Sequence, residues 1–234
     1  MLVLDANALS VPGAVSHPDS FGMRTMLHTV DGATAAAITA PNNADGTLER
    51  RYLEAAVAVA ERGARALTTN CGFTLPYQHT LQQSTGLPVV SSALLLLPTL
   101  GDVYGSGVGV LTYDNDVLTT VLARSWDGRY IGVRCADVQR SGAWHALADV
   151  SGTSVDIEAM RDDLVAIADT FVRQNELTAL LLECTGFAPF ADALRTRLGL
   201  PVFDHIAIVR FLLGTPLPPA DLLTQASNEG MHHE

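Results

Sequence analysis

Residues 66–77 read ALTTNCGFTLPY and residues 179–190 read ALLLECTGFAPF, so Cys71 falls on Cys184 at a shift of 113 residues. In the same register, GLPV at 86–89 falls on GLPV at 199–202. Nine of the 24 positions from 66 to 89 are identical between the copies, whereas ordinary residue frequencies give about two. The repeat therefore predicts two copies of one structural unit.

Each copy predicts the same order of elements: a helix, a short buried strand that ends just before the cysteine, a second helix that begins at a proline, and a second strand. The helices are expected at Leu48–Arg62 and Asp156–Asn175 and after Pro76 and Pro189, and the strands at Ala66–Thr69, Val89–Val90, Ala179–Leu182 and Val202–Phe203. Further strands are expected at Leu2–Leu4, Ala37–Thr39, Val108–Thr112 and Tyr130–Arg134. This alternation predicts an α/β fold of two pseudo-symmetric lobes, each a short parallel sheet flanked by helices, with the active site in the cleft between them.

The boundary between the lobes is expected in the glycine-rich stretch 101–109. We place an N-terminal lobe at residues 1–104 and a C-terminal lobe at residues 105–204. A helix from about His205 to Leu213 is expected to return, so that the segment 205–234 packs on the N-terminal lobe. The polar, proline-containing tail from Thr215 is expected to fray.

The composition excludes several classes of function. The formal net charge of −11, from 14 basic and 25 acidic residues, disfavours nucleic acid as a partner. All basic residues are arginine, so pyridoxal phosphate cannot form its lysine Schiff base here. The three cysteines suggest neither a disulfide framework nor a metal site. No signal peptide or membrane span is recognised, and we expect a cytoplasmic protein that needs no cofactor and no membrane.

Cys71 and Cys184 stand where parallel α/β sheets bind ligands, at the carboxyl ends of strands. Each precedes a predicted helix start, which favours an anion and should lower the thiol pKa. If the two copies pack about a pseudo-twofold axis, the thiols face each other across one cleft. A thiolate and a thiol on opposite faces of a carbon can remove a proton and return another, which inverts that carbon.

The residues around both cysteines, TTNCGF at 68–73 and LECTGF at 182–187, resemble the paired motifs of the aspartate/glutamate/hydantoin racemase superfamily. The similarity extends to both GLPV segments and to Pro12-Gly13 and Ser20-Phe21. The resemblance implies two α/β domains with the active site between them, Cys71 and Cys184 as the catalytic pair, and a possible homodimer. Glutamate racemases differ at the residues after each cysteine, so the resemblance does not name the substrate.

Several residues near the thiols are candidates for holding a small carboxylate or carbonyl substrate. The substrate-binding candidates are Gly13, Ser20, Phe21, Asn70, Gly72, Phe73, Thr112, Tyr113, Thr185 and Gly186. Backbone and side-chain donors among them would stabilise the carbanion or enolate. Some have structural alternatives: Gly72 and Gly186 can relieve a tight turn, and Thr112 or Asp114 can cap the following helix. Cys135 is expected to be packing, and Asp204 is either a helix cap or a site residue.

The pattern favours a cofactor-independent racemase or epimerase that inverts a carbon next to a carboxylate or carbonyl of an amino acid or related compound. One alternative in the same superfamily is a decarboxylase or cis–trans isomerase acting on a dicarboxylic acid through a single thiol. An alternative of another class is a non-catalytic protein that binds a small acid. Exchange of the α-hydrogen, release of carbon dioxide, or binding without turnover would distinguish the three.

Overall fold

The structure is a computed structural model that describes residues 1–6, 11–17, 19–40, 46–126, 129–130, 132–145 and 156–214. Its strands are β1 (Leu2–Leu4), β2 (His28–Val30), β3 (Leu67–Thr68), β4 (Val89–Val90), β5 (Val108–Thr112), β6 (Arg134–Asp137), β7 (Ala179–Leu182) and β8 (Val202–Phe203). Its helices are α1 (Ala35–Thr39), α2 (Thr47–Glu61), α3 (Gln78–Thr85), α4 (Leu97–Tyr104), α5 (Asn115–Ser125), α6 (Gly142–His145), α7 (Ile157–Asn175), α8 (Ala191–Leu198) and α9 (His205–Leu212). The expected tail from Thr215 lies outside the described residues.

Both halves have the same strand order. In the C-terminal half, four parallel strands run in the order β6-β5-β7-β8. In the N-terminal half, the parallel pairs β1-β2 and β3-β4 meet at a bridge between Leu2 and Thr69, which gives the corresponding order β2-β1-β3-β4. The predicted α/β fold with two pseudo-symmetric lobes is confirmed. The cysteine strands β3 and β7 occupy equivalent positions in it.

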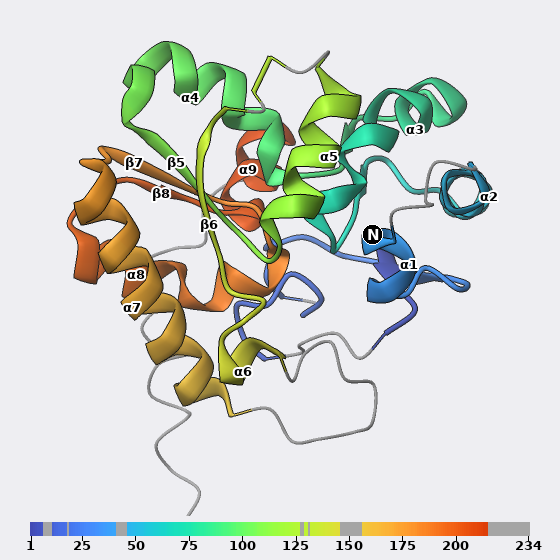
Figure 1. Cartoon of the computed structure of the whole chain (residues 1–234). Helices are drawn as coiled ribbons and strands as arrows, with labels where there is room; N and C mark the ends of the chain where they lie inside the picture. Colours follow the sequence, from blue (N-terminus) through green and yellow to red (C-terminus); the bar gives the residue numbers. More distant parts are fainter. Residues whose placement is uncertain are drawn as a thin grey trace, which may run out of the picture.

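Helices cover the sheets from both sides, as right-handed crossovers between parallel strands require. In the C-terminal half, α7 and α8 lie on one face of the sheet, and α4 and α5 lie on the other (Figure 1). The helix α4 follows β4 of the first half but contacts β5 and β7 of the second. In return, α9 follows β8 but contacts β4. Each half therefore contributes one helix to the other half.

Two expected strands are placed differently in the structure. Residues Ala37–Thr39 belong to the short helix α1, because three consecutive alanines favour a helix and Thr34 caps it, accepting a hydrogen bond from the Ala37 N–H at 3.1 Å. The strand expected at Tyr130–Arg134 is β6, which begins at Arg134 and pairs with β5 from Gly109 onward. Short apolar runs do not distinguish helix from strand by their pattern alone, which explains the first error.

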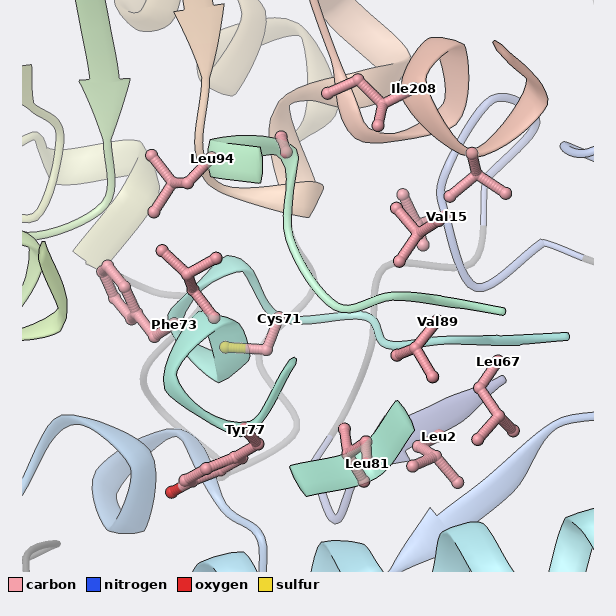
Figure 2. Packing of buried hydrophobic residues seen from close by; sticks show 14 of the residues in the cluster. Leu2, Val15, Leu67, Cys71, Phe73, Tyr77, Leu81, Val89, Leu94 and Ile208 are labelled. Atoms are coloured by element: carbon pink, nitrogen blue, oxygen red, sulfur yellow. The ribbon is translucent and has the colours of Figure 1, made fainter. Parts of the chain in front are cut away.

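The prolines after the cysteines lie in 3₁₀ turns that precede the α-helices. Pro76 falls inside the turn Gly72–Tyr77, and Pro189 falls inside the turn Thr185–Phe190. The expected helices α3 and α8 begin only after these turns. Figure 2 shows Cys71 at the start of the first turn, surrounded by buried side chains that include Phe73, Leu94 and Tyr77.

None of the helices within the described ranges combines the length and apolar character needed to cross a membrane.

Candidate active site

A cavity of about 370 Å³ lies between the two halves and is lined by residues of both. From the N-terminal half come Leu4, Ala6, Ala14, Val15, Ser16, Ala35, Ala36, Ile38, Thr39, Asn70, Cys71, Gly72 and Phe73; from the C-terminal half come Tyr113, Glu183, Cys184, Thr185 and Gly186. Both repeated cysteines therefore reach one cavity. Apolar walls with a few polar groups are typical of small-molecule sites.

Each thiol lies a short step beyond its strand, since β3 ends at Thr68 and β7 at Leu182, and backbone N–H groups of the next turn hydrogen-bond to the sulfur. The Phe73 N–H donates a hydrogen bond to the sulfur of Cys71. The N–H groups of Gly186 and Phe187 donate to the sulfur of Cys184. The two strand–cysteine–turn units are thus equivalent in their local hydrogen bonding. Such N–H groups stabilise a thiolate.

Burial nevertheless dominates the ionisation of both thiols. It raises the pKa of Cys71 to about 12, and the nearby Glu183 carboxyl adds to the rise, whereas the Phe73 N–H opposes it. Burial likewise raises the pKa of Cys184 well above its ordinary value, and Glu183 again adds to the rise. The expectation of a lowered thiol pKa is therefore wrong, because removal of a thiolate from water outweighs the turn N–H groups.

The two halves touch directly beside the thiols. The Thr185 hydroxyl donates a hydrogen bond to the backbone carbonyl of Asn70. Gly72 packs against Glu183 so closely that a Cβ at Gly72 would overlap both the carboxyl Oε1 and the backbone oxygen of Glu183. Since the φ of Gly72 is not positive, glycine is required here for a close approach between the halves and not for a turn. By contrast, a Cβ at Gly186 would lie 3.5 Å from the Cys184 sulfur, which is ordinary contact.

Glu183 is the functional candidate that the sequence analysis missed. It is buried, with 1% of its surface exposed, and it lines the cavity next to Cys184. Its Oε2 accepts a hydrogen bond from the Thr112 hydroxyl at 2.7 Å and one from the Tyr113 N–H at 3.4 Å. Burial raises its pKa to about 7, and these two donors oppose the rise. The signal in the sequence was an acidic residue between the apolar strand LLL and the cysteine.

The repeat places Asn70 at the position equivalent to Glu183. The Asn70 N–H donates to the Leu2 carbonyl at 3.2 Å, as the Glu183 N–H donates to the Leu111 carbonyl at 2.8 Å. The Asn70 Oδ1 accepts from the Leu4 N–H at 2.8 Å, as Glu183 Oε2 accepts from the Tyr113 N–H. Both side chains therefore join the cysteine strand to its central neighbour, but one is a neutral amide and the other an acid.

Four of the predicted substrate-binding residues are not among those that line the cavity. Thr112 is fully buried and holds Glu183, while Asp114 caps α5. The Ser20 hydroxyl donates to the Ala14 carbonyl, so it positions a loop that does line the cavity. Phe21 is buried in the N-terminal core and Gly13 forms a turn with a φ of 84°.

Other residues weighed from the sequence have structural roles. Asp204 caps α9 by accepting the Ala207 N–H at 2.9 Å, and it also pairs with Arg195. Cys135 is half-buried in β6 and is not among the residues lining the cavity between the halves.

A family model described as Asp/Glu/Hydantoin racemase matches residues 19–209. The chain belongs to this family. Among curated members of similar sequence, a dimethylsulfoniopropionate lyase of Durusdinium sp. clade D is 29% identical over 90% of this chain and 72% of its own length. Dimethylsulfoniopropionate lyase 6 of Emiliania huxleyi is 28% identical over 87% of this chain, which spans 55% of that relative.

Solved structures of the same fold include an unliganded arylmalonate decarboxylase, with a TM-score of 0.61 and 17% identity over 94% of each chain. The allantoin racemase from Klebsiella pneumoniae has a TM-score of 0.57 and 17% identity, over 91% of this chain and 85% of its own. These TM-scores support a shared fold. Identities this low carry no assignment of substrate.

Proposed function

We propose that this chain is a thiol-dependent lyase. It removes a proton from the carbon next to a carboxylate and cleaves the bond between the neighbouring carbon and a sulfonium sulfur, which leaves as a neutral sulfide. The observation that carries the proposal is one cavity that holds two thiols and one buried acid. The names of the curated relatives support dimethylsulfoniopropionate as the substrate class. This departs from the racemase favoured by the sequence, because the relatives are lyases.

In the proposed step, a cysteine thiolate takes the α-proton and becomes a thiol. The electron pair of the broken C–H bond forms the C=C bond of acrylate. The C–S bond breaks with its electron pair going to sulfur, and neutral dimethyl sulfide leaves. We expect backbone N–H groups at the start of the two cysteine turns, where Gly72 and Thr185 line the cavity, to stabilise the negative charge that develops on the carboxylate.

The raised thiol pKa values suit a cationic substrate. Burial raises the pKa of both thiols, which favours their protonated form at neutral pH. A positive charge bound nearby stabilises a thiolate and lowers its pKa. A sulfonium substrate would thereby help to generate the base that attacks it, which a neutral substrate would not do.

The test is to incubate the purified protein with dimethylsulfoniopropionate and to follow dimethyl sulfide by gas chromatography and acrylate by liquid chromatography. Wild type should form both products in equal amounts. Loss of a general base lowers turnover by about 10²–10⁴-fold, so Cys71→Ala or Cys184→Ala should do so. Absence of product from wild type, or full turnover in both variants, would refute the proposal.

Racemisation is a second candidate, favoured by the equivalent positions of the two thiols in the repeat. The pattern of losses separates the two reactions. Elimination needs one thiol as the base, so one alanine variant should lose far more turnover than the other. Racemisation needs both thiols, so both variants should fail to invert a chiral acid and to exchange its α-hydrogen with solvent deuterium.

A further inference from the structure

The pseudo-symmetry of the site is broken at several positions, and at the buried pair of Asn70 and Glu183 it sets a neutral amide against an acid. Both side chains accept a backbone N–H from the neighbouring central strand, as described above. The Asn70 amide shows that a neutral side chain suffices for this structural bond. The hydrogen bond from the Tyr113 N–H therefore does not by itself explain why position 183 carries an acid.

The two carboxyl oxygens of Glu183 differ in their contacts. Oε2 carries both hydrogen bonds of the side chain, and within the described ranges Oε1 accepts none. Oε1 faces Gly72, which itself lines the cavity beside Cys71. The missing Cβ of Gly72 leaves the space that this oxygen occupies. This oxygen thus lies between the two cysteine turns.

No cation within the described part of the chain neutralises this acid. Among the described residues, none of the ion pairs includes Glu183, and no positive group lowers its pKa. It is also the one charged side chain among the described residues that line the cavity. An ionised carboxyl is costly to bury without a partner, so a cationic ligand group would offset the cost of ionising Glu183.

Aromatic side chains on the same cavity suit a quaternary cation. Phe73 comes from the N-terminal half and Tyr113 from the C-terminal half, and both line the cavity. Onium groups bind well against aromatic faces because the ring quadrupole attracts positive charge. The cavity therefore combines a single anionic oxygen, apolar walls and two rings.

We infer that Glu183 is the specificity-determining residue that selects substrates carrying a sulfonium or quaternary ammonium group two carbons from the carboxylate. The inference deepens the proposed lyase function and rests on it for the reaction, although the binding preference can be measured without turnover. Asn70, at the equivalent position, leaves the opposite side of the cavity neutral. The site is thus built for a ligand with a positive end, oriented in one direction.

The experiment compares two matched ligands by calorimetry. One is trimethylammonium propanoate, whose amine is a poor leaving group; the other is its carbon isostere, in which a tert-butyl group replaces the trimethylammonium group. Wild type should bind the cation about tenfold or more tightly than the isostere above neutral pH. Glu183→Gln should lose this preference through weaker binding of the cation, while it still binds the isostere, which keeps the carboxylate but has no positive charge; that binding also shows that the variant is folded.

Asp114→Asn is the matched control. It removes a negative charge close to Glu183 but outside the cavity lining, and asparagine preserves the cap of α5. This variant should retain the preference for the cation. Retention of the full preference in Glu183→Gln, or its loss in both variants alike, would overturn the assignment.

A pH series on wild type gives a second measurement that needs no variant. The described titratable groups that act on Glu183 or are acted on by it are Cys71, Cys184 and Asp114, and the Tyr113 phenol lines the same cavity. Burial raises the pKa of both thiols and of the Tyr113 phenol, which opposes their ionisation over the range used, whereas the Glu183 carboxyl titrates within it. The preference should fall several-fold between about pH 8.5 and about pH 5.5, as the carboxyl gains a proton. A preference that does not change with pH would overturn the inference.

These outcomes separate the two proposals. A protein that prefers the cation but releases no dimethyl sulfide supports the role of Glu183 and refutes the lyase. A protein that releases dimethyl sulfide but keeps its preference in Glu183→Gln supports the lyase and refutes the role of Glu183.

Discussion

Replacing Glu183 by glutamine should remove a pH dependence from the stability of the fold. Burial raises the pKa of this carboxyl from 4.5 to about 7, so the folded chain holds a proton that the unfolded chain releases. A group with a raised folded-state pKa contributes stability that is fully present below pH 4.5 and is lost as the pH rises through 7. At about 1.4 kcal/mol for each pKa unit, the loss amounts to about 3 kcal/mol.

The assay is urea unfolding of wild type and Glu183→Gln at several values between pH 4.5 and pH 8. Glutamine is neutral throughout and keeps an oxygen for the Thr112 hydroxyl. The free energy of unfolding of wild type, relative to the variant, should therefore fall by about 3 kcal/mol across this range. A constant difference would refute the reasoning. Glu54→Gln, which removes an exposed carboxyl on α2, should show little change with pH.

Three further outcomes follow from the structure. Cys135→Ala should retain dimethyl sulfide release, because Cys135 is not among the residues lining the cavity; a large loss in a folded variant would mean that this thiol takes part. Gly72→Ala should destabilise the fold by about 1–3 kcal/mol, measured by urea unfolding, because the added Cβ would overlap Glu183. Gly101→Ala should not destabilise the fold, because the space around Gly101 is open. Equal stability of the two variants would contradict the close approach of Gly72 to Glu183. His205 is buried and burial lowers its pKa from 6.5 to about 4. The free energy of unfolding of wild type, relative to His205→Gln, should therefore fall by about 3 kcal/mol as the pH falls through this interval. An identical pH dependence in both proteins would argue against this contribution of His205.

The repeat was sufficient to predict the architecture around the cysteines. A shared register over two segments implies the same local fold in each. The structure agrees, because β3 and β7 are each followed by a cysteine and then by a 3₁₀ turn. The helices α2 and α7 were predictable because each is long and has a clear apolar stripe. The errors fell on short elements. The helix α1 has five residues and the strand β2 has three, and elements this short show too little hydrophobic periodicity to be predicted from the sequence.

The site was predictable only in part. Position at a strand end is a local property, so Asn70, Gly72 and Thr185 could be selected from their neighbours in the chain, and they do line the cavity. The contribution of α1 and of residues Ala14–Ser16 could not be foreseen, because these segments reach the cavity only through the packing of the halves. Ser20 was selected by resemblance, and the structure places it one contact away, where it holds that loop.

The sequence by itself determined that two equivalent thiols stand at the ends of parallel strands, since the repeat and the alternation of elements require nothing beyond local pattern. Only the tertiary structure decided how those thiols ionise. Their pKa values depend on how completely the two halves exclude water and on the approach of Glu183, and both are properties of the packed pair. A turn N–H acts on its own neighbour in the chain, whereas desolvation is imposed by the whole fold, and here the second effect is the larger.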